Sequence, residues 1–231
     1  METKRRRTRR FFIAVGALCV LGVVFAALVL RGVLVLNTPS RADYPVWGVD
    51  VSHYQGEIDW EALRAQGVRF AFIKATEGSS HVDERFAQNA GEALAAGVPA
   101  GAYHFFSFES PGQTQAENLL SALEGREFAL PCAVDFEFYG AFFENPPDLE
   151  DTRAELRAML EAVEAETGRK PLLYATWRSY RMYLMGAFDD YPLWIRDVYL
   201  WPGLTLPNRD WTFWQYSDKG TLAGYTGEEE H

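Results

Sequence analysis

The chain has 231 residues, 48% of them hydrophobic and 15% aromatic, which is enough for one sizeable core and about one domain. Residues 1–31 carry seven Lys or Arg and one acid, so with a total of −10 the remaining 200 residues carry a net charge of −16. An acidic domain argues against nucleic acid as a partner, because phosphate binding needs a basic face. It is compatible with a neutral or mildly cationic polymer such as a glycan.

A basic segment and a long apolar run open the chain. Six Lys or Arg precede Phe11, and the next 20 residues carry no charge, which is the length of a membrane-spanning helix. A cleaved signal peptide usually has a shorter apolar core that ends in a small-x-small site. Here the run stays apolar beyond Ala26-Ala27, so we favour an uncleaved signal anchor in a bacterial cell membrane. The predicted parts are a cytoplasmic segment (1–10), a single-pass anchor (11–36), a linker (37–45) and an extracytoplasmic domain (46–231).

The two cysteines are predicted to stay unpaired. Cys19 lies in the apolar run, and Cys132 precedes a predicted core strand, so the two belong to different compartments. The spacing of Cys and His residues does not resemble a zinc site.

Short apolar runs alternate with amphipathic stretches from Val46 onward. The predicted strands are 46–51, 69–75, 99–106, 130–138, 171–176, 193–195 and 211–216, and the predicted helices are 60–66, 84–96, 113–123 and 149–166. Strands separated by helices imply βαβ units and a parallel sheet. At least five such repeats favour a β/α barrel over an open sheet. The helix-poor C-terminal end suggests a modified, irregular TIM-like α/β barrel.

Two acids share one face of the predicted strand 130–138. Side chains alternate along a strand, so Asp135 and Glu137 point one way and Val134, Phe136 and Phe138 point the other. Burial and mutual repulsion should raise the pKa of at least one carboxyl group, as a general acid at neutral pH requires. The alternative is a strand end at which both acids are hydrated or salt-bridged.

A third acid, Asp50, ends the first predicted strand. In a closed barrel, strands one and four face each other across the mouth, where chemistry occurs in this type of fold. Asp50 is therefore expected to approach Asp135 and Glu137. The histidines His53, His81 and His104 are scattered and suggest structural or substrate-contact roles rather than a Ser-His-Asp triad.

Aromatic residues crowd the same strand ends. They are Tyr54, Tyr103, Phe105, Phe106, Tyr174, Trp177, Trp194, Trp214 and Tyr216. Core packing is the simpler explanation for any single one of them, but the set indicates a sugar-stacking cleft. Aromatic residues with paired acids fit glycoside hydrolysis, which usually uses two carboxyl groups.

A set of motifs resembles the family 25 glycoside hydrolases, the muramidases that cut peptidoglycan. The motifs, in family order over about residues 46–226, are Gly48-Val49-Asp50-Val51-Ser52, Gln55-Gly56, Ile58-Asp59-Trp60, Phe72-Ile73-Lys74-Ala75-Thr76-Glu77-Gly78, Gly101-Ala102-Tyr103-His104-Phe105, Asp135-Phe136-Glu137, Pro192-Leu193-Trp194-Ile195 and Trp214-Gln215-Tyr216-Ser217. The resemblance implies a modified β/α barrel that hydrolyses the β-1,4 bond between N-acetylmuramic acid and N-acetylglucosamine with retention.

The resemblance also implies roles for individual residues. Glu137 matches the general acid/base, Asp135 the acid that orients the substrate's acetamido group, and Asp50 an acid that supports the site. The candidate substrate-binding residues are Tyr54, Lys74, Glu77, Tyr103, His104, Phe106, Tyr174, Trp177, Trp194, Trp214 and Gln215. No metal or cofactor is implied, and the expected state is a monomer that binds a peptidoglycan glycan strand.

One departure from the family concerns the C-terminus. The resemblance implies a last active-site Asp beyond Trp-Gln-Tyr-Ser, in a Val-Asp-Leu-Asn-like segment, whereas this sequence runs out at residues 227–231. We therefore expect the sequence to be a truncated piece. Two alternatives stay open: a peptidoglycan-binding module that has lost catalysis, and a chitinase-like glycosidase with the same Asp-x-Glu spacing.

Overall fold

The computed structural model describes residues 2–31, 34 and 37–227, except for the side chains of residues 2–6, 8, 9 and 30. Parts of the predicted anchor (32, 33, 35 and 36) and the last four residues of the predicted domain lie outside the described residues. The contacts divide the chain into two compact units, Met1–Thr38 and Pro39–His231. Most of the predicted linker thus packs as part of the second unit.

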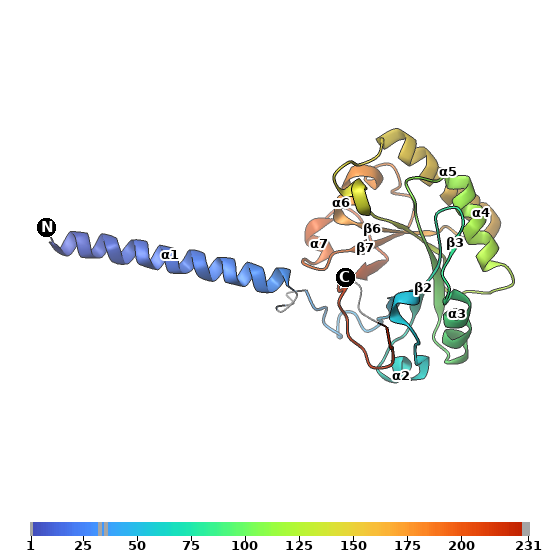
Figure 1. Cartoon of the computed structure of the whole chain (residues 1–231), viewed down its shortest axis with the longest axis horizontal. Coiled ribbons are helices and arrows are strands. Elements are labelled where there is room, and N and C mark those ends of the chain that lie inside the picture. The colour runs from blue at the N-terminus through green and yellow to red at the C-terminus, as the bar shows by residue number, and fades with distance from the viewer. Residues whose placement is uncertain (1, 32–33, 35–36, 228–231) are drawn as a thin grey trace. The chain divides into compact units, whose positions relative to one another are not determined.

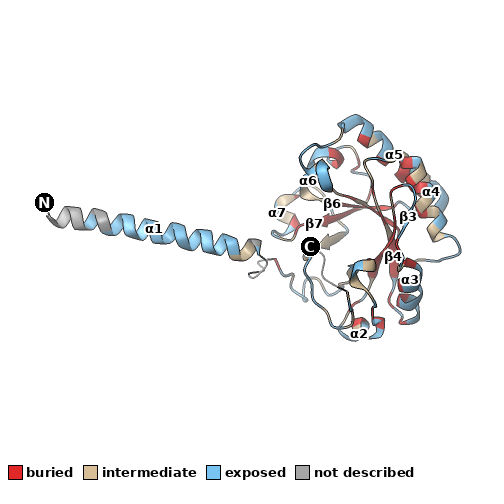
Figure 2. Cartoon of the chain, viewed as in Figure 1, coloured by how far each residue is buried: buried red, intermediate tan, exposed pale blue. Residues whose placement is uncertain are grey.

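The first unit is dominated by helix α1 (Glu2–Leu30), whose apolar surface is exposed along most of its length (Figure 2). Within it, Arg10–Val29 is a 20-residue stretch with a mean hydropathy of 2.9, long and apolar enough to cross a membrane. This length and composition fit a membrane anchor and equally fit a signal sequence.

The second unit is built on a curled, mainly parallel sheet. Its strands are β1 (Val49–Val51), β2 (Ala71–Glu77), β4 (Ala100–Phe105), β5 (Ala133–Phe136), β6 (Leu172–Thr176), β7 (Leu193–Arg196) and β8 (Phe213–Gln215), paired in that order. The two-residue strand β3 (His81–Val82) pairs antiparallel with the end of β2 and was not predicted. Because the long pairings are parallel, the carboxyl ends of the strands meet at one edge of the sheet.

Helices of 6 to 19 residues follow most of the first strands, whereas only helical segments of 3 to 5 residues follow the last strands, as the sequence predicts. The helices α2 (Trp60–Ala65), α3 (Phe86–Ala95), α4 (Gly112–Leu123) and α5 (Leu149–Thr167) each lie within two residues of a predicted range. Helix α5 begins where the Asp148 carboxylate accepts the backbone N–H of Asp151 at 3.0 Å and ends at Gly168, which has a left-handed φ of 67°. After β6 and β7 come only α6 (Trp177–Ser179), the short helix η3 (Tyr180–Leu184) and α7 (Pro202–Thr205). The long helices α3, α4 and α5 lie together on one side of the sheet (Figure 1).

The expected barrel is not closed, and this corrects the prediction. The sheet ends at β1 and β8, and no ladder joins these two strands in the described part of the chain. Both edge strands have only three residues, and the chain after β8 pairs instead with the segment after β1, through an isolated bridge between Ile58 and Tyr225. The result is an open half-barrel whose gap lies between β1 and β8.

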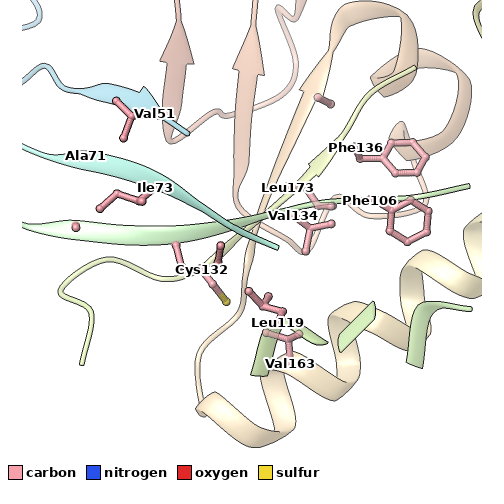
Figure 3. Packing of buried hydrophobic residues seen from close by; sticks show 14 of the residues in the cluster. Val51, Ala71, Ile73, Phe106, Leu119, Cys132, Val134, Phe136, Val163 and Leu173 are labelled. Atoms are coloured by element: carbon pink, nitrogen blue, oxygen red, sulfur yellow. The ribbon is translucent and has the colours of Figure 1, made fainter. Parts of the chain in front are cut away.

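The sheet separates two apolar layers. The larger one fills the space between sheet and helices, where Ile73, Val134 and Phe136 from the strands meet Leu119 and Val163 from α4 and α5 (Figure 3). The smaller one lies inside the curl and contains Phe72, Ala133, Leu172, Tyr174 and Trp194. Phe72 stacks on Trp194 with ring centroids 4.5 Å apart. This inner layer fills the concave side of the sheet beneath the strand ends.

A close approach of two helices makes one glycine indispensable. A Cβ at Gly112, the first residue of α4, would lie 1.8 Å from the carbonyl oxygen of Glu155 on α5. We expect Gly112→Ala to lower the free energy of unfolding by about 3 kcal/mol, because the two backbones must move apart. Gly91 on α3 is the matched control, since a Cβ there meets nothing within 4 Å. Gly91→Ala should stabilise the domain by up to about 1 kcal/mol. Urea unfolding followed by near-ultraviolet circular dichroism measures the free energy of unfolding of both variants. Equal changes in Gly112→Ala and Gly91→Ala would contradict the packing argument.

Candidate active site

A cleft of about 910 Å³ runs along the open side of the half-barrel, and it is lined among others by Asp50, Asp135 and Glu137, which lie toward the carboxyl ends of β1 and β5. Asp135 lies on β5, Glu137 directly follows that strand, and Asp50 lies on β1. Alternation along β5 places Val134 and Phe136 in the buried layer on the other face. Three acids from two distant segments therefore border one cleft.

Asp135 is the most strongly perturbed of the three acids. Its Oδ1 atom is buried and finds no hydrogen-bond partner among the described residues. Burial raises the pKa of Asp135 well above its usual range, and the charge of Glu137 raises it further, while Lys74 lowers it. The Oδ1 atom of Asp135 can therefore accept a hydrogen bond from a ligand in a site of low dielectric constant.

Glu137 is half-buried, and burial also raises its pKa above the ordinary value of a glutamate. Two neighbouring charges act in opposite directions: the Arg196 guanidinium lowers this pKa, and the Asp50 carboxylate raises it. The net shift is upward, so Glu137 retains a proton at a higher pH than an exposed glutamate does.

Asp50 is held by a chain of hydrogen bonds that crosses the gap of the half-barrel. The Tyr174 hydroxyl donates to Gln215 Oε1 at 2.8 Å, and Gln215 Nε2 donates to Asp50 Oδ2 at 2.7 Å. Solvent reaches Asp50 through the cleft mouth, yet surrounding protein raises its pKa to about 6, while the bond from Gln215 opposes this shift. Burial also raises the pKa of Tyr174 well above its ordinary value, so this tyrosine remains a donor and fixes the orientation of the amide.

The other predicted site residues divide into three groups: those that line the cleft, those that lie outside it, and two that are fully buried. Tyr103, Tyr174, Trp194, Trp214 and Gln215 line the cleft. Tyr54, Lys74, Glu77 and Trp177 are not among the lining residues. Lys74 Nζ donates to Glu77 Oε2 at 2.7 Å, and its charge acts on Asp135 from a distance. The ring of Trp177 lies under the Arg181 guanidinium at 4.4 Å.

Two predicted substrate contacts are contradicted by their placement. His104 is fully buried on the helix-facing side of β4, where its ring nitrogens lie 2.8 Å from Thr76 Oγ1 and 3.1 Å from Gln115 Oε1. Burial lowers the pKa of His104 to about 4, so the ring is neutral. Phe106 is also buried and packs against Phe136 with centroids 5.4 Å apart (Figure 3). Both residues alternate with Tyr103, which faces the cleft, and therefore point away from it.

An ion pair at the cleft was not predicted from the sequence. Arg196 ends β7, forms a salt bridge with Asp218 and influences the pKa of Glu137. Both residues line the cleft. The sequence could have predicted the position of Arg196, because this residue lies two residues after Trp194 and the two side chains therefore share one face of the strand.

The described side chains contain no cluster of three or more His, Cys, Asp or Glu residues arranged to hold a metal ion. The chemistry that the cleft itself offers is proton transfer by carboxyl groups, next to aromatic side chains that suit a sugar face.

Comparisons with known proteins agree on one family. Residues 49–225 match the family described as glycosyl hydrolases family 25. The structure of a family 25 glycosyl hydrolase from Bacillus anthracis is similar with a TM-score of 0.74 and 46% identity, covering 80% of this chain and 85% of that chain. Lysozyme M1 of Streptomyces globisporus is 33% identical over 202 residues, 79% of this chain and 65% of that protein. An N,O-diacetylmuramidase of Chalaropsis sp is 32% identical over 196 residues, 78% of this chain and 91% of that protein.

Proposed function

This chain belongs to family 25 of the glycosyl hydrolases, and on that premise we propose that it is an N-acetylmuramidase. It hydrolyses the β-1,4 bond between N-acetylmuramic acid and N-acetylglucosamine in peptidoglycan. The observation that carries the proposal is the pair of carboxyl groups with raised pKa values, Asp135 and Glu137, at one cleft. Its relatives named lysozyme and N,O-diacetylmuramidase support the same substrate.

Glu137 acts as the general acid and then as the general base. Its raised pKa keeps the proton that it transfers to the leaving oxygen as the bond from C1 to that oxygen breaks. The acetamido oxygen of the same muramic acid bonds to C1, so an oxazolinium intermediate forms. Water then attacks C1, the bond from C1 to the acetamido oxygen breaks, and the water gives a proton to the Glu137 carboxylate, which restores the acid and retains the configuration.

Asp135 and Asp50 support this step in different ways. The open Oδ1 of Asp135 accepts the acetamido N–H and turns the acetamido oxygen toward C1. Hydrogen bonding to this N–H favours the ionised carboxylate and so counteracts the effect of burial on its pKa. Asp50 is positioned through Gln215 and Tyr174, and its charge raises the pKa of Glu137.

Product analysis tests the assignment directly. The full chain in detergent is incubated with purified peptidoglycan and separately with chitin. The products are reduced to mark the sugar at their reducing ends and are identified by mass spectrometry. Muropeptides that end in reducing N-acetylmuramic acid support a muramidase. Release from chitin alone would favour a chitinase-like glycosidase, and tight binding to peptidoglycan without new reducing ends would favour a binding module.

The pH profile offers a test of the charges around Glu137. Activity requires the protonated acid, so it is lost as pH rises through the raised pKa of Glu137. Arg196→Gln removes a charge that lowers this pKa, so the alkaline limb of kcat/KM should move to higher pH. Asp50→Asn removes a charge that raises the pKa of Glu137, so the alkaline limb should move to lower pH. The maximal kcat/KM of this variant should also be lower than that of wild type. Limbs that shift in the same direction in both variants would contradict the assignment of this limb to Glu137.

Helix α1 acts as an uncleaved anchor that holds the domain on the outer side of the cell membrane. The apolar stretch Arg10–Val29 and the preceding basic segment support this proposal. Membrane fractionation with N-terminal sequencing of the bound protein tests it. Protein found in the medium without residues 1–36 would show that the helix is a cleaved signal.

A further inference from the structure

A segment that precedes the first strand packs along the open side of the cleft. The Tyr44 ring stacks on Trp211 with centroids 6.1 Å apart and meets Trp214 edge-on at 5.7 Å. Its hydroxyl accepts the indole N–H of Trp201 at 3.0 Å. These contacts hold Tyr44 beside β8, and Arg41 and Tyr44 line the cleft together with Asp50 and Glu137.

Arg41 brings a positive charge to an acidic cleft. It is exposed, lies 4.2 Å over the Trp47 ring and donates to the Tyr216 hydroxyl at 3.3 Å. It forms no ion pair with any acidic side chain that the structure describes, whereas the guanidinium of Arg196 at the same cleft is paired with Asp218. These two contacts leave other guanidinium N–H groups open, and their planar fork matches a carboxylate.

The gap of the half-barrel lies beside this arginine, because Arg41 donates to the hydroxyl of Tyr216, which directly follows β8. The hydrogen bond between Gln215 and Asp50 spans the gap between β8 and β1. A sugar that touches Asp50 therefore lies next to the gap, and Arg41 and Tyr44 lie on the β8 side of that gap. In the proposed reaction that sugar is muramic acid, whose lactyl arm ends in a carboxylate or is extended by a peptide that carries carboxylates.

We propose that Arg41 forms a subsite for a carboxylate carried on the lactyl arm of the muramic acid, with Tyr44 as the positioning residue that holds the segment in place. The inference rests on the proposed muramidase function and deepens it. It gives the segment of the second unit that precedes β1 a part in substrate recognition.

The test compares Arg41→Gln with Arg181→Gln in the full chain. Arg181 is a matched control because it is also exposed and stacked over a tryptophan, at 4.4 Å, but does not line the cleft. The substrates are soluble uncrosslinked peptidoglycan strands, with and without prior removal of the stem peptides by an amidase. Each is used as prepared and after conversion of its carboxylates to methylamides with carbodiimide and methylamine.

Arg41→Gln is expected to raise KM roughly 5-fold to 10-fold on strands with free carboxylates and to leave kcat unchanged. On methylamidated strands, wild type and Arg41→Gln should share one high KM, while Arg181→Gln matches wild type throughout. A rise confined to peptide-bearing strands identifies a stem-peptide carboxylate, and a rise confined to stripped strands identifies the lactyl carboxylate. The inference is overturned if Arg41→Gln behaves as wild type, or if its defect persists equally on methylamidated strands, as a purely structural role of Arg41 predicts. A wild-type protein that cleaves none of the strands would instead refute the proposed function.

Discussion

Replacing Glu137 by Gln is expected to lower kcat for muropeptide release by a factor on the order of 10³. The amide keeps the size of the side chain but cannot give a proton to the leaving oxygen. The fold should survive, because the structure shows no hydrogen bond or ion pair of the Glu137 carboxyl group with the other residues that it describes. Steady-state release of reducing ends, with circular dichroism on the same samples, measures both effects.

Two comparisons make this experiment specific for the role of Glu137. Glu144→Gln changes an exposed acid in the loop that follows Glu137 and should leave activity unchanged. A substrate with a nitrophenolate leaving group needs little help from an acid, so Glu137→Gln should lose far less activity on it. Undiminished release from natural strands by Glu137→Gln would refute the assignment of this residue as the acid.

Local patterns predicted most of the half-barrel. The alternation of apolar runs with amphipathic stretches gave the seven parallel strands, and glycines such as Gly97 and Gly168 marked where helices end. Period-two alternation predicted that Asp135 and Glu137 share a face. The same alternation applied to Tyr103 would have placed His104 and Phe106 in the buried layer, so that error lay in the interpretation and not in the sequence.

Other features depend on contacts between distant segments and leave no local pattern. The gap between β1 and β8 arises because each edge strand has three residues and the chain after β8 pairs with the segment around Ile58. The packing of Tyr44 on Trp211 and Trp214 joins positions separated by more than 160 residues. Residues 37–45 contain two prolines and several polar residues, which is typical of a linker, and the aromatic partners that hold Tyr44 lie far along the chain.

Replacing Asp135 by Asn is expected to reduce activity and increase stability together. Burial raises the pKa of Asp135 above its unfolded value, so near pH 7 the ionised carboxylate disfavours the folded state. The neutral amide removes that penalty, and we expect the Tm at pH 7 to rise by roughly 2–4 °C, which corresponds to about 1 kcal/mol. The activity should fall by a factor on the order of 10², because the amide orients the acetamido group without a negative charge.

The pH dependence of this stabilisation separates a charge effect from better packing. The folded state with Asp135 binds an extra proton between the unfolded pKa and the raised folded pKa, so wild type regains stability as pH falls through the folded value. The difference in Tm between Asp135→Asn and wild type should therefore shrink on acidification and vanish below the unfolded pKa of about 3.9. Thermal unfolding of both proteins from pH 3 to 7.5 measures it. A difference that stays constant with pH would show that the gain comes from packing, and a lower Tm at pH 7 would show that the carboxylate supports the fold as well as the substrate.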